Sequence, residues 1–372
     1  MHYIPSVAFL LTAGSLLVQA VSVKDPRNVV LSSATCKVPN RAAGVTQDIQ
    51  IKYVDINPGA KRTLLMVHGW PGLWHVWKGQ IEAFKDDYHI IAVNQRGFGG
   101  SEHPGDLETS STFGDLVGDL TCVLEHAQVS HAACLGHDWG TQTCYEAARM
   151  RPDVFEAVIG TAIPYIPYSG PFVPIANMVA MLPTIAYNVF FQDKTLEAAQ
   201  ELNGDIRRTL RGIMRTVESP PPSEFLKQTD SFMRGWDSVE DIPPIPFLTT
   251  EEEEYWVEQF ESHKFDHTLG FYTHGTRHGS WTFAQAQENH TIPQPVLAIL
   301  PTNDPVCNWV EAAVLMKSAD HVPRLTMKTV DAAHWIIIEK PTEVNAIMKE
   351  WLDEHYAALP TREEQTHAKD EL

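Results

Sequence analysis

Short apolar runs of β-forming residues recur along the first part of the chain, separated by stretches with helical periodicity. The runs have the length of strands and lie at residues 63–67, 89–93, 131–135 and 154–159. Between the second and third runs, residues 112–127 carry apolar side chains at helical spacing, namely Leu116, Leu120, Val123 and Leu124. Strands that alternate with helices predict βαβ units and a mostly parallel α/β sheet with flanking helices.

The alternation stops near residue 164 and resumes near residue 291. Residues 164–290 are aromatic and helical in pattern and are interrupted by prolines. Within this segment Thr250 precedes a run of four glutamates, which predicts a helix start with Thr250 as the N-cap. The run of acids is therefore interpreted as the first turn of a helix rather than as a cation site.

Strand patterns return at residues 296–300 and 325–330, and Pro341 marks the start of a last helix that reaches about residue 357. We therefore expect an α/β core with an inserted helical lid, or cap. The first part of the core spans residues 23–163, the lid 164–290 and the second part of the core 291–360.

Both ends of the chain carry features of targeting signals. Residues 1–22 contain an apolar run that is too short to span a membrane, which predicts a signal peptide; an uncleaved amphipathic anchor is the alternative. Residues 361–372 are polar and end in Lys-Asp-Glu-Leu, the endoplasmic reticulum (ER) retention sequence. Together they predict a flexible tail, an ER-lumenal location and recognition by the ER retention receptor.

Composition limits the classes of partner. The chain has 372 residues, 20% of them charged, and a net charge of −19. Such a chain suits one large domain with an insertion, or two small domains, and argues against bulk disorder. The strong negative charge also argues against nucleic-acid binding. A monomer or a dimer is expected.

The cysteines and one sequon give expectations that depend on the compartment. There are five cysteines and no CxxC pair, so no disulfide framework is predicted, although the ER lumen permits disulfides. Cys134 and Cys144 are interpreted as small buried hydrophobic residues. Asn289 begins an Asn-His-Thr sequon, which predicts a glycosylation site that is either used or left unmodified.

No metal or cofactor is expected. His263 and His267, and likewise His274 and His278, are four residues apart, a spacing that can face a metal on a helix. Neither pair carries the glutamate of the H-E-x-x-H motif, and the glycines beside the second pair argue against a helix there. The chain also lacks the Gly-x-Gly-x-x-Gly motif and distant acid of a dinucleotide site.

Residues 136–140, Gly-His-Asp-Trp-Gly, have the spacing of a nucleophile elbow, but the centre is Asp138 instead of serine. The motif follows a predicted strand and precedes a predicted helix, which is the context an elbow requires. The alternative is a turn in which Asp138 only caps the helix. A carboxylate is ionised at neutral pH and needs no base to activate it, so Asp138 can displace a leaving group from saturated carbon and form an ester.

The rest of a hydrolytic site follows in the chain order expected for this type of elbow. Two backbone N–H groups are expected to form an oxyanion hole. The loop after residues 63–67 supplies that of Trp70, and the residue after the elbow aspartate supplies that of Trp139. Asp304 and His334 come just after predicted strands, so they are the expected acid and base, with Asp331 as a rival for the acid. His334 would then activate the water that hydrolyses the ester.

The leaving group depends on the lid. A halide favours indole N–H donors, whereas an epoxide oxygen needs a proton donor such as a neutral phenol. The lid offers five tyrosines, at 165, 168, 187, 255 and 272. Aromatic packing explains such tyrosines equally well, so composition alone does not decide.

Over residues 50–357 the chain resembles the α/β-hydrolase-fold epoxide hydrolases, particularly their soluble branch. The resemblance rests on the ordered motifs HGWPGLWHVW (68–77), NQRGFGGSE (94–102), GHDWG (136–140), YNVFFQDKTLEAAQEL (187–202), GFYTHGT (270–276) and AHWIIIEKPTEVN (333–345). It implies an α/β-hydrolase fold with Asp138 as nucleophile, Asp304 as acid, His334 as base, and Tyr187 and Tyr272 as donors to the epoxide oxygen. After Tyr272 the sequence Thr-His-Gly departs from the Tyr-Arg-Asn associated with that branch.

The same resemblance carries further expectations. It implies His68, Pro71, Phe191 and Trp335 as walls of an apolar substrate pocket, with a small apolar epoxide as substrate and a vicinal diol as product. Family and compartment together suggest a fungal secondary-metabolite enzyme. It would hydrolyse or cyclise a polyketide epoxide that an upstream membrane-bound monooxygenase supplies. The alternatives are a haloalkane or haloacid dehalogenase, and a non-catalytic binding protein on the same fold.

Overall fold

An eight-stranded sheet forms the centre of the fold in the computed structural model, which describes residues 23, 25–357 and 359. The strand order is β1-β2-β4-β3-β5-β6-β7-β8, and β2 runs antiparallel to both of its neighbours while all pairs from β4–β3 onward are parallel. The strands are β1 (Ser32–Asn40), β2 (Val45–Ile56), β3 (Thr63–Val67), β4 (His89–Val93), β5 (Ala132–His137), β6 (Phe155–Thr161), β7 (Val296–Pro301) and β8 (Leu325–Val330). The predicted signal peptide and retention sequence lie outside the described residues.

The predicted strands are present, and burial explains why their sequences are apolar runs. Every residue of β3, β4, β5 and β7 is buried, because helices cover both faces of the parallel part of the sheet. The expectation of a mostly parallel sheet is confirmed, with strand ends within two residues of the predicted ones.

The hairpin of β1 and β2 was not predicted from the apolar runs. Its strands pair in antiparallel register from Ser32 opposite Tyr53 to Asn40 opposite Val45. Only one face is buried, so apolar residues such as Ile49 and Ile51 alternate with polar ones. A half-buried edge hairpin therefore gives a period of two instead of an apolar run.

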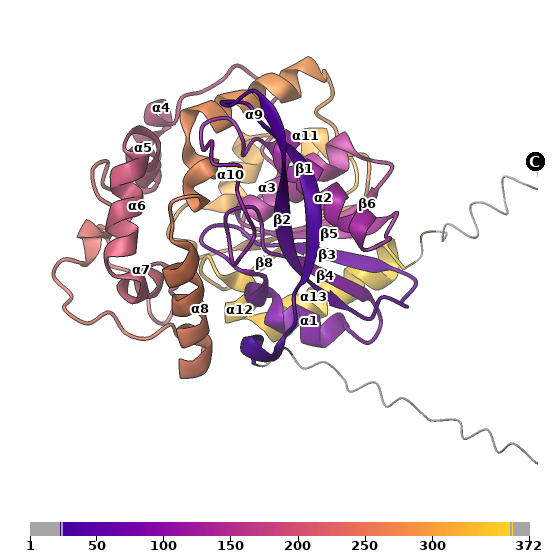
Figure 1. Cartoon of the computed structure of the whole chain (residues 1–372), viewed down its shortest axis with the longest axis horizontal. Helices are drawn as coiled ribbons and strands as arrows, with labels where there is room; N and C mark the ends of the chain where they lie inside the picture. Colours follow the sequence, from indigo (N-terminus) through magenta and orange to yellow (C-terminus); the bar gives the residue numbers. More distant parts are fainter. Residues whose placement is uncertain (1–22, 24, 358, 360–372) are drawn as a thin grey trace, which may run out of the picture.

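Helices cover the two faces of the sheet (Figure 1). One face carries α2 (Phe113–His126) and α3 (Trp139–Met150), with α10 (Trp309–Leu315) and α11 (Ser318–His321) at the β7–β8 end. The other face carries α1 (Lys78–Phe84), α12 (Ile336–Glu339) and α13 (Pro341–His355). No helix in the described ranges has the length and apolar character to cross a bilayer.

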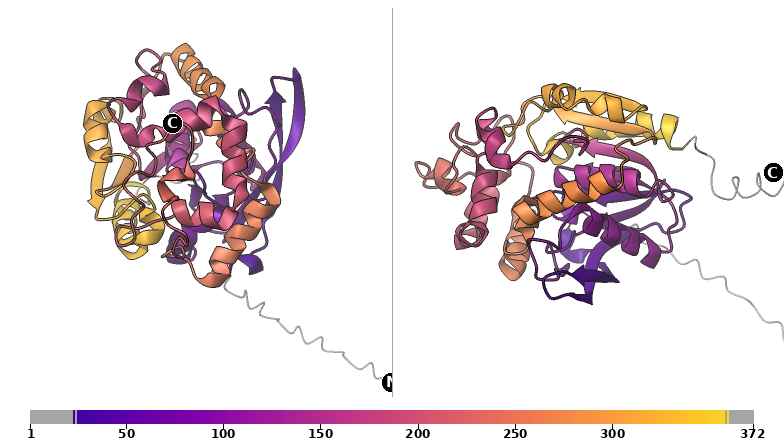
Figure 2. Two further views of the ribbon diagram at one scale, coloured as in Figure 1. Left: turned by 90° about the vertical axis from the view of Figure 1, so that its left-hand side faces the viewer. Right: turned by 90° about the horizontal axis from the view of Figure 1, so that it is seen from above.

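The chain between β6 and β7 is helical, in the segment expected to form the lid. Figure 2 shows most of these helices grouped to one side of the sheet, while the last of them runs back along the core, where it contacts α2. They are α4 (Ile175–Val179), α5 (Tyr187–Asp193), α6 (Thr195–Gly204), α7 (Ile206–Ile213), α8 (Thr250–His263) and α9 (His274–Ala286). Short 3₁₀ helices add η1 (Pro26–Asn28), η2 (Trp74–Trp77), η3 (Pro183–Ile185), η4 (Met233–Trp236) and η5 (Thr268–Tyr272).

Two details of the lid helices correct the sequence interpretation. The N-cap of α8 is Thr249 rather than Thr250, because Thr249 and Glu252 form a reciprocal capping box. The second histidine pair, His274 and His278, does lie on a helix, since α9 starts at His274 despite its two glycines. The side chain of Thr273 caps α9 by accepting from the backbone N–H of Thr276, which helps a glycine-containing first turn to form.

Four of the five cysteines form disulfides, which corrects the interpretation of Cys134 and Cys144 as unpaired buried residues. Cys36 on β1 bonds Cys122 on α2, and Cys134 on β5 bonds Cys144 on α3. The second pair is close because α3 folds back onto the strand that precedes it, so the two Cα atoms lie 5.4 Å apart. Only Cys307 is free among the described residues.

Candidate active site

Asp138 lies on a sharp turn between β5 and α3. Its backbone has φ 54° and ψ −125°, a conformation that costs a non-glycine residue energy and that the surroundings must enforce. Gly136 and Gly140 permit the turn, because a Cβ at Gly136 would strike the backbone of Thr141 and one at Gly140 would strike the carbonyl oxygen of Val67. The glycines of the motif therefore allow the strand, the turn and the helix to approach closely.

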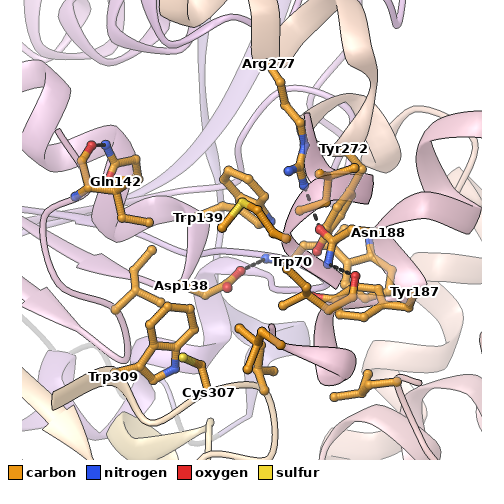
Figure 3. A pocket seen from close by; sticks show the side chains of 18 of the residues that line it. Trp70, Asp138, Trp139, Gln142, Tyr187, Asn188, Tyr272, Arg277, Cys307 and Trp309 are labelled. Carbon is orange, nitrogen blue, oxygen red and sulfur yellow. Dashed lines mark hydrogen bonds between the residues drawn. The ribbon is translucent and has the colours of Figure 1, made fainter. Parts of the chain in front are cut away.

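The Asp138 carboxylate is held by backbone N–H groups. The amide of Trp70 donates to Oδ1 at 2.8 Å, as the dashed line in Figure 3 shows. Burial raises the pKa of Asp138. The positive charge of His334 and hydrogen bonds from the amides of Trp139 and Trp70 oppose this effect, and the pKa stays above its ordinary value. The two amides predicted to form the oxyanion hole thus both act on this carboxyl group.

His334 and Asp304 form a hydrogen-bonded pair at the ends of β8 and β7. His334 Nδ1 lies 2.7 Å from Asp304 Oδ2, and the Asp304 side chain is fully buried. Asp304 also accepts from the backbone N–H of Val306 and the indole of Trp309, both at 2.8 Å, so its orientation is fixed. The rival acid, Asp331, is exposed and accepts from Asn303 instead.

The other ring nitrogen of His334 faces Asp138. Its Nε2 lies 3.6 Å from Asp138 Oδ2, and the imidazole is 13% exposed. Burial alone would lower the pKa of His334, but the charges of Asp304 and Asp138 outweigh it and raise the pKa to about 9. His137 supports the ring from behind, because its Nε2–H donates to the backbone oxygen of His334 at 2.9 Å.

Two of the tyrosines in residues 164–290 lie next to each other and line the same cavity as Asp138 and His334. Tyr187 begins α5 and Tyr272 ends η5, and their ring centroids are 6.0 Å apart. Phe191 packs edge-on against both rings, at 5.4 and 5.0 Å, which fixes the pair. Burial raises the pKa of each phenol, so both are neutral donors at physiological pH.

The other three tyrosines have different surroundings. Tyr255 accepts a hydrogen bond from the indole of Trp74, and Tyr165 donates to the backbone oxygen of His290. Neither lines the cavity described next, whereas Tyr168 does.

A cavity of about 670 Å³ joins these groups, and its size suits a small organic molecule. Core and lid both contribute to its wall, and Asp138, His334, Tyr187 and Tyr272 all line it. Most of the remaining wall is apolar, including Ile163, Met178, Leu182, Phe225, Leu226 and Phe232.

The four residues expected to form the pocket wall lie behind it. Buried His68 donates from Nδ1 to the oxygen of Gly69 and accepts at Nε2 from the amide of Gln95, so it positions the loop that carries Trp70. Trp335 donates to the oxygen of Ile213 from a buried position. Pro71 and Phe191 are also buried and absent from the cavity lining. These four residues support the site without lining its cavity.

Several polar lining residues were missed by the sequence interpretation, among them Gln142, Asn188, Arg215 and Arg277. Gln142 bonds both backbone groups of Ile166 and so ties α3 to the start of the lid. Arg277 donates to Asn188 at 2.6 Å, and both line the cavity. The only sequence signal for Arg277 was its position five residues after Tyr272, in the segment that departs from the Tyr-Arg-Asn pattern.

Asn289, the sequon residue, lies outside the site. Its side chain is exposed, and Oδ1 accepts from the backbone N–H of Thr291 at 3.0 Å. Its backbone oxygen accepts from Arg149 at 2.8 Å, which anchors the turn. The side chain is therefore accessible to a modifying enzyme, and modification remains a prediction.

Comparisons with known proteins agree with this geometry. A family model described as the alpha/beta hydrolase fold matches residues 62–341. The chain is 28% identical over 315 residues to epoxide hydrolase A of Mycobacterium tuberculosis, covering 82% of this chain and 95% of that relative. It is 27% identical to bifunctional epoxide hydrolase 2 of Sus scrofa, covering 82% of this chain but only 53% of that longer relative.

A solved structure gives the same result for the fold. The crystal structure of epoxide hydrolase A from Mycobacterium thermoresistibile superposes with a TM-score of 0.72 at 26% identity, covering 87% of this chain and 98% of that one. The fold class expected from the sequence, a mostly parallel sheet with flanking helices and an inserted helical region, is thereby confirmed.

Proposed function

Because the chain belongs to the α/β-hydrolase fold family, we propose that it is an epoxide hydrolase that works through an ester on Asp138. One observation carries the proposal: a carboxylate at the elbow shares a cavity with two buried phenols and a histidine–aspartate pair. The similarity to epoxide hydrolases of bacteria and animals supports the same reaction.

The first step opens the epoxide. Asp138 Oδ1 is bound to the amide of Trp70, so Oδ2 is the oxygen that attacks. A bond forms between Oδ2 and an epoxide carbon, and the bond from that carbon to the ring oxygen breaks. Tyr187 or Tyr272 donates its proton to the departing oxygen, since an alkoxide is otherwise a poor leaving group.

The second step hydrolyses the ester. Esterification removes the negative charge of Asp138, and this lowers the pKa of His334 toward that of a general base. As its pKa falls, His334 releases its proton to solvent, and the phenolate left by ring opening takes up a proton from solvent. The neutral imidazole then takes a proton from water, whose oxygen adds to the ester carbonyl carbon, while Asp304 stabilises the imidazolium that forms. The charge develops on Oδ1, which accepts from the amide of Trp70, and the amide of Trp139 also acts on this group. When the intermediate collapses, the bond between the carboxyl carbon and Oδ2 breaks, the imidazolium of His334 gives its proton to Oδ2, and the diol leaves with that oxygen.

The dehalogenase alternative is disfavoured by the indoles near the site. The indole N–H of Trp70 donates to Thr268 at 3.1 Å, and that of Trp309 donates to Asp304 at 2.8 Å. Both are occupied, and the side chain of Trp139, which also lines the cavity, is hydrogen-bonded to Tyr272. These three indoles are therefore already engaged, whereas two phenols line the cavity. A non-catalytic binding protein is disfavoured because simple binding has no use for His334 and Asp304 aligned behind Asp138.

We propose an epoxide with an extensive apolar part as the substrate and a vicinal diol as the product. The apolar wall supports the first point, and the position of His334 near the ester supports water as the second nucleophile. Cyclisation of a polyketide epoxide would share the ring-opening step but would use a hydroxyl of the substrate in place of water. No contact in the site favours it, and product analysis separates the two outcomes.

We also propose that the protein works in the ER lumen, with the retention receptor as its partner. The two disulfides support an oxidising compartment. An endoglycosidase H–sensitive glycan that disappears in Asn289→Gln would support this location. A chain that stays unmodified, with its cysteines reduced in cells, would contradict it.

The function is tested by trapping the ester. His334→Gln should react with a model epoxide such as styrene oxide and gain the mass of one epoxide molecule on the peptide that contains Asp138. The double variant Asp138→Asn/His334→Gln is the matched control and should gain no mass. Halide release from haloalkanes by the wild-type enzyme, with no diol from any epoxide, would contradict the proposal.

A further inference from the structure

The ionisable groups that line the cavity differ in sign from the protein as a whole. The chain carries a net charge of −19, yet its cavity is lined by two arginines, Arg215 and Arg277, and by His334. Asp138 is the only aspartate or glutamate among the lining residues. The cavity is therefore a cationic region inside an acidic protein.

The two arginines differ in how their charges are satisfied. Arg215 donates to a series of backbone oxygens, including those of Pro243 at 2.7 Å, Arg211 at 3.0 Å and Ser219 at 3.1 Å. Its guanidinium is thus occupied and has a structural role in the lid.

Arg277 is much less satisfied. Its Nη2 donates to the neutral side chain of Asn188 at 2.6 Å, and its buried Nε has no hydrogen-bond partner. No aspartate or glutamate of the described ranges forms an ion pair with it. The residue as a whole is partly exposed, so its charge is only partly removed from water, and a buried N–H without an acceptor is unfavourable unless a ligand reaches it.

The position of Arg277 is fixed by two aromatic rings. The guanidinium carbon lies 5.4 Å from the ring centroid of Trp139 and 5.8 Å from that of Tyr272. Figure 3 shows Arg277 extending toward Tyr272 and Asn188 from α9. Stacking holds the planar group in place and leaves part of its hydrogen-bonding edge for a ligand.

We propose that Arg277 binds an acidic group of the substrate, so that the natural substrate is an epoxide that carries a carboxylate. This inference rests on the proposed function, since it assigns a substrate class to the same site. Guanidinium and carboxylate match in shape and form two parallel hydrogen bonds. The apolar wall then receives the carbon chain between the carboxylate and the ring.

A second role for Arg277 makes a different prediction. Its positive charge near Tyr272 also favours the ionised phenol, so it could act only by assisting proton donation. That effect would be the same for acidic and neutral substrates, whereas binding of a carboxylate discriminates between them.

The kinetic test uses a series of epoxy carboxylic acids of several chain lengths and the matching carboxamides. The measured quantity is the ratio of kcat/KM for the acid to that for the amide, because this ratio cancels any shared effect on the tyrosines. The wild-type ratio should be at least about 10 for the best chain length, and Arg277→Gln should bring it near 1 mainly by raising KM for the acid. Arg277→Lys should retain part of the preference.

Arg234→Gln is the matched control, because Arg234 is a half-exposed lid arginine paired with Asp230 and does not line the cavity. It removes the same charge and should leave the ratio unchanged. A wild-type ratio near 1 would overturn the proposal, as would an Arg277→Gln variant that lowers kcat equally for acid and amide. If Arg277→Gln fails to fold, a wild-type ratio near 1 still overturns the proposal, and a reduced ratio in Arg277→Lys, which keeps the positive charge, supports the assignment to Arg277.

A binding measurement separates this proposal from the proposed function. Calorimetry should show that 4-phenylbutyrate binds the wild-type enzyme at least about 10-fold more tightly than 4-phenylbutyramide, and that Arg277→Gln removes the difference. This result without turnover of any epoxide would sustain the anion site and overturn the epoxide hydrolase assignment. Turnover of epoxides with equal binding of acid and amide would support the epoxide hydrolase assignment and overturn the anion site.

Discussion

His334 Nε2 lies 3.6 Å from Oδ2 of Asp138, beyond hydrogen-bonding distance but close enough for each charge to act on the other. The histidine is therefore stabilised as a cation in the free enzyme while its Nε2 stays available to water. Once the carboxylate becomes an ester, half of the negative charge around His334 is gone. In the proposed mechanism, the imidazolium keeps the Asp138 carboxylate ionised for ring opening. After the ester has formed, the lower pKa of His334 lets the neutral imidazole act as the base for hydrolysis.

The raised pKa of His334 predicts a pH-dependent stability. The folded-state pKa of about 9 exceeds the value of 6.5 expected in the unfolded chain, so the imidazolium stabilises the fold. This contribution is complete below pH 6.5 and is lost as the pH rises through 9, with a ceiling of about 3 kcal/mol at 1.36 kcal/mol per pKa unit. Urea unfolding at a series of pH values should show this decline.

The control for this experiment is His334→Gln, which cannot titrate. Its free energy of unfolding should fall less than that of the wild type between pH 6.5 and 9. Asp138→Asn should also show a smaller fall, because one of the two carboxylates that stabilise the cation is removed. Equal slopes for all three proteins would refute the charge coupling.

The two phenols should act before the ester forms. Tyr187→Phe and Tyr272→Phe should each slow epoxide consumption in a single turnover by about 10²-fold, and the double variant by more, since a general acid contributes about 10²–10⁴. Ester hydrolysis should change little, because the proposed role of both phenols ends once the epoxide oxygen is protonated. Tyr255→Phe is the control, since its phenol bonds Trp74 outside the cavity. Unchanged ring opening in the double variant would exclude the proposed donors.

The two disulfides should stabilise the protein unequally. The Cys36–Cys122 bond joins residues 86 apart, and the Cys134–Cys144 bond joins residues 10 apart. In the chain-entropy model, replacing the first pair by alanine should cost about 2 kcal/mol more than replacing the second. Chemical unfolding of the two double variants measures the difference, with Cys307→Ala as the control for a free cysteine. A larger loss from the short loop would show that packing, rather than loop closure, dominates.

The proximity of Asp138, Asp304 and His334 was predictable because its signals are local. The glycines at 136 and 140 are required by close backbone contacts, so they mark the elbow in the sequence itself. Asp304 and His334 come three and four residues after the ends of β7 and β8, and parallel strands bring their C-terminal ends to one edge. The spacing of these residues along the chain was therefore enough to predict that the three side chains lie close together.

Features that depend on long-range packing were not predictable in the same way. The β1–β2 hairpin has one polar face and gives no apolar run, and the Cys36–Cys122 bond depends on where that hairpin packs against α2. The start of α9 is stabilised by the Thr273 cap, which outweighs the low helix propensity of its glycines. Arg277 has no distinguishing spacing, because its role arises only where α9 meets Trp139 and Asn188.

The central claim is that a side-chain oxygen of Asp138 enters the product. A single turnover in ¹⁸O-labelled water, with enzyme in excess over a model epoxide, tests it most directly. An ester on Asp138 gives an unlabelled diol and one ¹⁸O atom in the Asp138 carboxylate, found by mass spectrometry of its peptide. A diol that carries ¹⁸O after this first turnover, with Asp138 unlabelled, would show direct attack by water and contradict the account.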